Sequence, residues 1–285
     1  MRIYNVAGYA LVIAHGLVSA LLAPAELGPW RGLAIGTLYL VFIWLVGGLY
    51  LSNVLHMGIA HRALDFNDTF VKVLALVNNT AAIYINPRTW VNRHRHHHAF
   101  SDHPGDPNKL AGDGFWKTLY LCVSPYPCGS NLARDPILDT WPLRLAASSG
   151  LAVVSQLSSY ALLWLVVRDW AYALALWVSV RMVGLWVNMI QNFWTHDRRF
   201  GTRRYDDAAD NAMNIGDWLP VTATFSACWQ NNHHHHPNLL RLSHDPAEYD
   251  WGFLTVRGLK TLGLVRPTRT GAQLPKDFPL KDLGF

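Results

Sequence analysis

The chain contains four apolar stretches that are each long enough to cross a lipid bilayer. They run from about residue 4 to 23, 32 to 55, 145 to 167 and 171 to 194. A helix needs about 20 mostly apolar residues to span the hydrocarbon core. Only 15% of the residues are charged, against about 25% in soluble domains. We therefore predict an all-α integral membrane protein with four transmembrane helices, forming a single membrane-embedded domain over residues 1–285.

Three other segments are predicted to lie outside the four spans. Residues 71–85 are apolar but short, and they include Lys72, Asn78 and Asn79. We expect them to be interfacial or re-entrant, since they are too short and too polar to span comfortably. Residues 218–229 are similar. Residues 267–285 are polar and contain proline, which predicts a loose C-terminal tail.

The first stretch has an alternative interpretation as a signal peptide, because Ala23-Pro24-Ala25 imitates a small-residue cleavage site. Its charged region is only Arg2, and its apolar run is long. Removing it would also place the histidine clusters on opposite sides of the membrane. We therefore expect the first stretch to be a span.

The basic residues predict the orientation. Of the 24 lysines and arginines, 20 lie in the polar segments 56–144 and 195–285. Cytoplasmic loops carry such an excess, which predicts both polar segments and both termini on the cytoplasmic side. We expect a bacterial inner membrane, because no targeting segment is evident in the sequence. This distribution also accounts for the net charge of +5. A nucleic-acid partner is not expected, because no basic stripe with interleaved aromatic residues is present.

The 14 histidines are concentrated in these two polar segments, in four clusters. The clusters are His56-x-x-x-x-His61, His94-x-His96-His97-His98, Asn192-x-x-x-His196 and Gln230-x-x-His233-His234-His235-His236. Residues three and four apart share one face of a helix. This spacing aligns His94 with His97 and His98, Asn192 with His196, and Gln230 with His233 and His234. Imidazole suits iron, copper, zinc and nickel, so we predict a cytoplasmic helical cap that holds a histidine-rich di-metal site.

These motifs resemble those of the membrane fatty acid desaturase family, particularly its acyl-CoA desaturase branch. That family carries an HxxxxH box, two HxxHH boxes and an additional Asn-x-x-x-His. The resemblance covers about residues 30 to 265 and includes the flanking residues Trp90 and Gly105-Asp106-Pro107. It implies metal ligation by His56, His61, His94, His97, His98, His196, His233 and His234, with Asn192 acting through a water molecule.

One position departs from the family pattern. Gln230 stands where the family has the first histidine of its third box. We count Gln230 as a further candidate ligand, although an amide oxygen is a weaker and harder ligand than imidazole. His235 and His236 extend the last box and are expected at the surface. Metal-bound histidines need their second ring nitrogen oriented by a carboxylate or carbonyl. The nearest carboxylates along the chain belong to Asp102, Asp106 and Asp197.

The resemblance implies oxygen-dependent desaturation of a fatty acyl chain at two iron ions, with O2 as co-substrate. The acyl chain would be carried by coenzyme A, acyl carrier protein or a membrane lipid. Electrons would come from an external donor such as a ferredoxin or cytochrome b5, attracted by the basic residues around Arg198 to Arg204. Hydroxylation or acetylene formation at the same site is an open alternative. An alternative from another class is a membrane protein that binds or transports metal, although a transporter would place ligands near the midplane.

Overall fold

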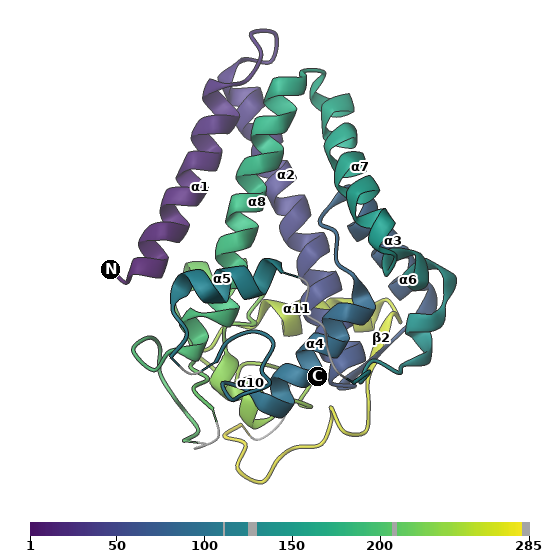
Figure 1. Cartoon of the computed structure of the whole chain (residues 1–285), viewed down its shortest axis with the longest axis vertical. Coiled ribbons are helices and arrows are strands. Elements are labelled where there is room, and N and C mark those ends of the chain that lie inside the picture. Colours follow the sequence, from purple (N-terminus) through teal and green to yellow (C-terminus); the bar gives the residue numbers. More distant parts are fainter. Residues whose placement is uncertain (111, 125–129, 207–209, 281–285) are drawn as a thin grey trace.

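The computed structural model describes residues 1–110, 112–124, 130–206 and 210–280. Four helices within these ranges are long and apolar enough to cross a membrane: Ile3–Leu21, Gly28–Ala60, Gly150–Val167 and Trp170–His196. They correspond to the four predicted spans, and the prediction of a mainly helical chain with four candidate membrane-spanning helices is confirmed. Figure 1 shows the spans side by side above a broader layer of short helices and loops.

The second span is longer than a bilayer requires. Helix α2 (Gly28–Gly48) continues directly into a π-helix, η1 (Leu49–Ala60), and together they contain 33 residues. Because about 20 residues cross the hydrocarbon core, the η1 end projects beyond it. Most of η1 is buried by the short helices and loops that surround it, and this buried part includes His56.

Small residues let the first span pack closely against the second and the fourth. Helix α1 (Ile3–Leu21) packs on both α2 and α8 (Trp170–Asn192). A Cβ atom on Gly36 would collide with Ser19, and one on Gly8 would collide with Trp186. Glycine at these positions lets the helix backbones approach, as is common between membrane helices. The ring nitrogen of Trp186 donates a hydrogen bond to the carbonyl of Tyr4 at 2.9 Å.

The layer below the spans, which we call the cap, is built from both polar segments, as predicted. Its helices are α3 (Asp68–Ala81), α4 (Pro87–Phe100), α5 (Phe115–Val123), η2 (Pro136–Asp139), α6 (Trp141–Ala146), η3 (Trp194–His196), α9 (Trp218–Ala223), α10 (Gln230–His235) and α11 (Trp251–Thr261). α7 (Ser149–Val167) completes the spans. The buried core is continuous from the spans into the cap, since one hydrophobic cluster includes both Tyr4 and Phe278.

Helix α3 accounts for the short apolar piece expected outside the spans. It packs against α7 and η1 and buries Leu74 and Ala75, while Val73 is about half exposed. Its 14 residues are fewer than a span requires. The other segment of this kind holds only the six-residue α9.

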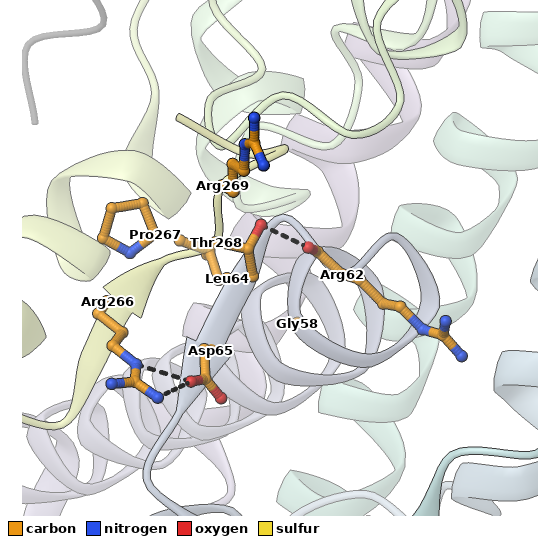
Figure 2. Close-up of a pocket in the computed structure, with 8 residues that line it drawn as sticks. All are labelled: Gly58, Arg62, Leu64, Asp65, Arg266, Pro267, Thr268 and Arg269. Atoms are coloured by element: carbon orange, nitrogen blue, oxygen red, sulfur yellow. Dashed lines mark hydrogen bonds and ion pairs between the residues drawn. The ribbon is translucent and has the colours of Figure 1, made fainter. Parts of the chain in front are cut away.

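The tail makes specific contacts where a loose extension was expected. Strand β2 (Val265–Pro267) pairs antiparallel with β1 (Leu64–Phe66), and Arg266 forms an ion pair with Asp65 at 2.6 Å (Figure 2). Farther along, the amide of Leu240 donates to the carbonyl of Gly271, and Phe278 is buried. The described tail residues are therefore part of the cap.

Candidate metal centre

The π-helix η1 explains how the first histidine pair converges. On an α-helix, two residues five apart point about 140° away from each other. A π-helix closes i→i+5 hydrogen bonds, so residues five apart lie about one turn apart and close to the same face of the helix. The amide of His61 donates to the carbonyl of His56 at 3.0 Å, as this geometry requires. The two ring centroids are 4.9 Å apart.

Arg95 holds the end of η1 in place. Its guanidinium donates to the carbonyls of Ile59 and Ala60 and to both carboxylate oxygens of Asp135. The last carbonyls of a helix have no partner within the helix, so this arginine satisfies groups that would otherwise be buried unpaired. Arg95 lies between two histidines of the second cluster, and we did not predict this function for it.

Helix α4 presents the second cluster as predicted. Its first residue, Pro87, suits a helix start, and the Asn86 side chain accepts the amide hydrogen of Thr89. His94, His97 and His98 face the interior of the cap. His96 lies 3.0 Å from the carbonyl of Ser130 instead, which agrees with its different helical face.

The third cluster differs from the predicted geometry, whereas the fourth agrees with it. Helix α8 ends at Asn192, and His196 lies in the separate 3-10 turn η3. The predicted placement of Asn192 and His196 on one α-helix is therefore wrong, because the α-helical segment ends before His196. Gln230, His233 and His234 do share the short helix α10.

The eight predicted histidine ligands separate into two groups. The five-histidine group contains His56, His61, His94, His98 and His233, and the three-histidine group contains His97, His196 and His234. In each group, one potential ligand atom per residue lies within 4.8 Å of all the others. Helices α4 and α10 contribute to both groups, because neighbouring histidines on each helix point to different sides.

The nitrogens of the five-histidine group are spaced as ligands of one ion. The Nε2 atoms of His56 and His233 lie 2.9 Å apart, those of His61 and His94 2.7 Å, and those of His98 and His233 3.0 Å. Nitrogens at right angles around an ion, with bonds of about 2.1 Å, lie about 3.0 Å apart. His233 has two such close neighbours on one nitrogen, which a network of neutral imidazoles does not satisfy well. The residues therefore fit a bound metal ion.

Burial keeps this group in its ligand form. Burial first, and then repulsion from neighbouring histidines, lowers the pKa values of His61, His94, His98 and His233 well below the ordinary value. Neutral imidazole is the form that binds a metal. Trp90 stacks on His94, with ring centroids 4.8 Å apart, and fixes the orientation of that ring.

Each member of the three-histidine group is instead oriented by an aspartate. Nδ1 donates to Asp106 in His97, to Asp102 in His196 and to Asp210 in His234, at distances of 2.8–3.0 Å. The Nε2 atoms of His196 and His234 are buried and have no hydrogen-bond partner. A histidine with a carboxylate on one nitrogen and an unpaired second nitrogen is the usual arrangement of a metal ligand. This group also fits a metal ion.

The loop after α4 positions two of these aspartates. Asp106 accepts the amide hydrogens of Asp102 and Asn108, and Asp102 accepts that of Asn211. Burial acts to raise the pKa values of Asp102 and Asp106, but the charge and hydrogen bond of their histidine partners outweigh it, and both values are lowered. Both carboxylates are thereby kept ionised as acceptors for the histidine Nδ1 hydrogens.

The predicted orienting partners were correct for two of three aspartates. Asp102 and Asp106 are confirmed, whereas Asp197 forms an ion pair with Arg199 at 2.5 Å. The third partner, Asp210, was missed. It precedes His234 by 24 residues, so only the fold brings the two together.

Gln230 and Asn192 each use their amide nitrogen elsewhere. Gln230 is buried and donates to the carbonyl of Ala227 at 2.8 Å. Asn192 donates to the carbonyl and side-chain oxygen of Asn188. Both side-chain oxygens are left for another partner. Ligation by Gln230, and by Asn192 through water, therefore stays a prediction.

The chain is similar to known proteins. The family model for fatty acid desaturases matches residues 28–246. The hex-5-enoyl-acyl-carrier-protein acetylenase of Moorena producens is 28% identical over 79% of this chain and 74% of its own length. The sn-1 stearoyl-lipid 9-desaturase of Anabaena variabilis is 27% identical over 81% and 82%, respectively. The Delta-9 acyl-lipid desaturase 2 of Arabidopsis thaliana is 27% identical over 86% and 76%.

The family match covers most of the chain and includes the elements that contribute all eight histidines of the two groups. The sequence motifs, the four spans and the paired histidine groups agree with it. The chain therefore belongs to the fatty acid desaturase family.

Proposed function

We propose that this fatty acyl desaturase binds two iron ions, one in each histidine group, and removes two hydrogen atoms from adjacent carbons of an acyl chain. The observation that carries the proposal is the division of eight histidines into two neighbouring groups. Bound iron would activate O2 and so supply an oxidant strong enough to break an aliphatic C–H bond, which no side chain can do.

The residues of the chain prepare the site for that chemistry. Asp102, Asp106 and Asp210 hold the Nδ1 hydrogens of their histidines, so that each Nε2 lone pair is directed inward. The burial of His233 and His196 excludes bulk water, which protects a reactive centre from side reactions. Gln230 offers an oxygen atom on α10, which also carries His234, and Asn192 offers one at the end of α8, four residues before His196. We assign the water-mediated contact to Asn192.

We assign a lipid-linked acyl chain as the substrate. The Anabaena and Arabidopsis relatives are named for acyl-lipid substrates. A surface pocket of about 560 Å³ lies beside the site, lined in part by Arg62, Arg266 and Arg269, and a neighbouring pocket reaches His61 itself. Within the described residues Arg269 has no carboxylate partner, so it is the cation best able to attract an anionic headgroup there. The Moorena relative, named for an acyl-carrier-protein substrate, makes that carrier the competing choice.

We place the cap on the cytoplasmic side of a bacterial inner membrane, because basic residues concentrate in cytoplasmic loops.

The electrons come from an external donor such as a ferredoxin or cytochrome b5. The three cysteines in the sequence are fewer than the four thiolates of an iron–sulfur cluster. Two arginines of the expected docking surface, Arg199 and Arg204, already have carboxylate partners, which weakens their attraction for an acidic donor.

The alternatives are less well supported. A metal transporter is not favoured, since the family is one of fatty acid desaturases and the histidines lie on the cap helices and at the cap ends of the spans. Acetylene formation has one relative in its favour, but the two 9-desaturases make simple desaturation the better assignment.

Expression in a bacterial host, followed by gas chromatography–mass spectrometry of total fatty acids with double-bond localisation, tests this function. We expect a new unsaturated acid with the intact chain and none with His97→Ala/His98→Ala. Separating the lipid and acyl-carrier-protein pools before analysis distinguishes the two carriers. A new hydroxy or acetylenic acid would overturn simple desaturation. No new product from a protein that contains its iron and is supplied with electrons would overturn the proposal.

A further inference from the structure

A third cluster of metal-binding side chains lies outside the two histidine groups. His235 Nε2 is 2.7 Å from one carboxylate oxygen of Asp277, and His236 Nε2 is 3.2 Å from the other. The ligand atoms of these three residues lie within 4.8 Å of one another. Two imidazoles and a carboxylate that converge in this way form a ligand set for a borderline divalent cation.

The two imidazoles are held in fixed orientations. His235 stacks on Tyr205 with ring centroids 3.9 Å apart and an angle of 6° between the planes. His236 contacts the rings of His244 and Phe278, and His244 is in turn bonded to the Tyr205 hydroxyl at 2.9 Å. A site whose ligands are locked by their neighbours loses little entropy when an ion binds.

The end of α10 explains why consecutive histidines converge. The helix ends at His235, and His236 has left the helical conformation, with φ −125° and ψ 66°. This break turns the His236 ring toward its neighbour, so that the two ring centroids are 4.3 Å apart. The side chains of His235 and His236 keep 22% and 14% exposure, enough for a cation to enter from solvent.

We infer that His235, His236 and Asp277 form a third metal site, which binds a borderline divalent cation such as Zn²⁺ and clamps the tail onto α10. His235 and His236 directly follow His233 and His234, which belong to the two histidine groups. The third belongs to the tail, next to the buried Phe278. The ion would stabilise the α10 end without taking part in oxygen chemistry.

Zinc binding to the full chain tests the inference. The protein is purified with an affinity tag that contains no histidine, loaded with iron, washed with a mild chelator and equilibrated with Zn²⁺ at increasing concentration. Zinc and iron are then counted by mass spectrometry. The variant is Asp277→Asn, which keeps size and hydrogen-bond capacity but removes the charged ligand. Asp68→Asn, at another exposed aspartate, is the matched control.

In the intact protein and the control we expect about one zinc ion per chain in addition to the iron. In Asp277→Asn the affinity for zinc should fall by at least about tenfold. The iron content should be equal in all three. Hydrogen exchange of residues 272–280 should slow on zinc addition in the intact protein only. Equal zinc binding in Asp277→Asn, or no additional zinc in the intact protein, would overturn the inference. Zinc binding that leaves hydrogen exchange of these residues unchanged would overturn the clamping of the tail by the ion.

Discussion

The two histidine groups share helices but differ in what surrounds each histidine. In the five-histidine group, imidazoles contact one another, and no carboxylate is paired with them among the described residues. In the three-histidine group, every imidazole has its own aspartate. The first group thus relies on the number of neutral ligands. The second has fewer histidines, which the carboxylates behind them would make more basic, and it would leave more positions open around a bound ion.

Loss of a ligand should have the largest effect, and the effect should differ between the groups. We expect both His196→Ala and His61→Ala to abolish product formation. His196→Ala removes one of only three histidines, so its ion should be lost from the purified protein. His61→Ala leaves four histidines, and much of its iron should remain. Iron per chain, measured by mass spectrometry, checks this difference, and equal iron loss in both variants would break the comparison.

Removal of an orienting charge should have the next largest effect. Asp106→Asn and Asp210→Asn should each lower iron affinity or activity by about 10- to 100-fold, because the carboxylate that orients and polarises the histidine is replaced by a neutral amide. Asp197→Asn is the control, since Asp197 is paired with Arg199. Activity assays and iron titration of all three variants test this. An equal loss in the control would show that these carboxylates support the fold rather than the ligands.

The stability of the metal-free protein should depend on pH through the five-histidine group. His61, His94, His98 and His233 have lowered pKa values when folded, so the unfolded chain takes up more protons below the ordinary histidine pKa of about 6.5. The free energy of unfolding should therefore fall as pH drops from about 6.5 toward the lowered values. Thermal melts between pH 7.5 and 5.5 measure this. His61→Gln should reduce the slope, and a slope that His61→Gln leaves unchanged would place the effect elsewhere.

Gln230→His should have the smallest effect. It offers an additional imidazole on the helix that holds His234, so the three-histidine group should retain its iron better during dialysis against a chelator. The expected gain is about tenfold, comparable to a single tuning contact at a metal site. The five-histidine group should be unaffected. If the variant binds iron no better than the natural chain, residue 230 is not close enough to the ion to act as a ligand.

The features that follow from local periodicity could be predicted. Apolar length marks the four spans, and the three- and four-residue spacings align the histidines of α4 and α10. The π-helix was missed because two histidines five residues apart do not share a face of an α-helix, so their spacing alone does not predict the helix type. Asp210 was missed because its contact with His234 forms only in the folded chain. The end of α8 at Asn192 was missed because the apolar run continues past it.

Mössbauer spectroscopy of the iron-57-loaded protein tests the central claim most directly. Two ions in unlike surroundings, one among five imidazoles and one among three imidazoles backed by aspartates, should give two distinct iron signals of equal intensity. Asp106→Asn should shift one of these signals and leave the other in place. A single signal, or a shift of both signals in that variant, would contradict the division into two different sites.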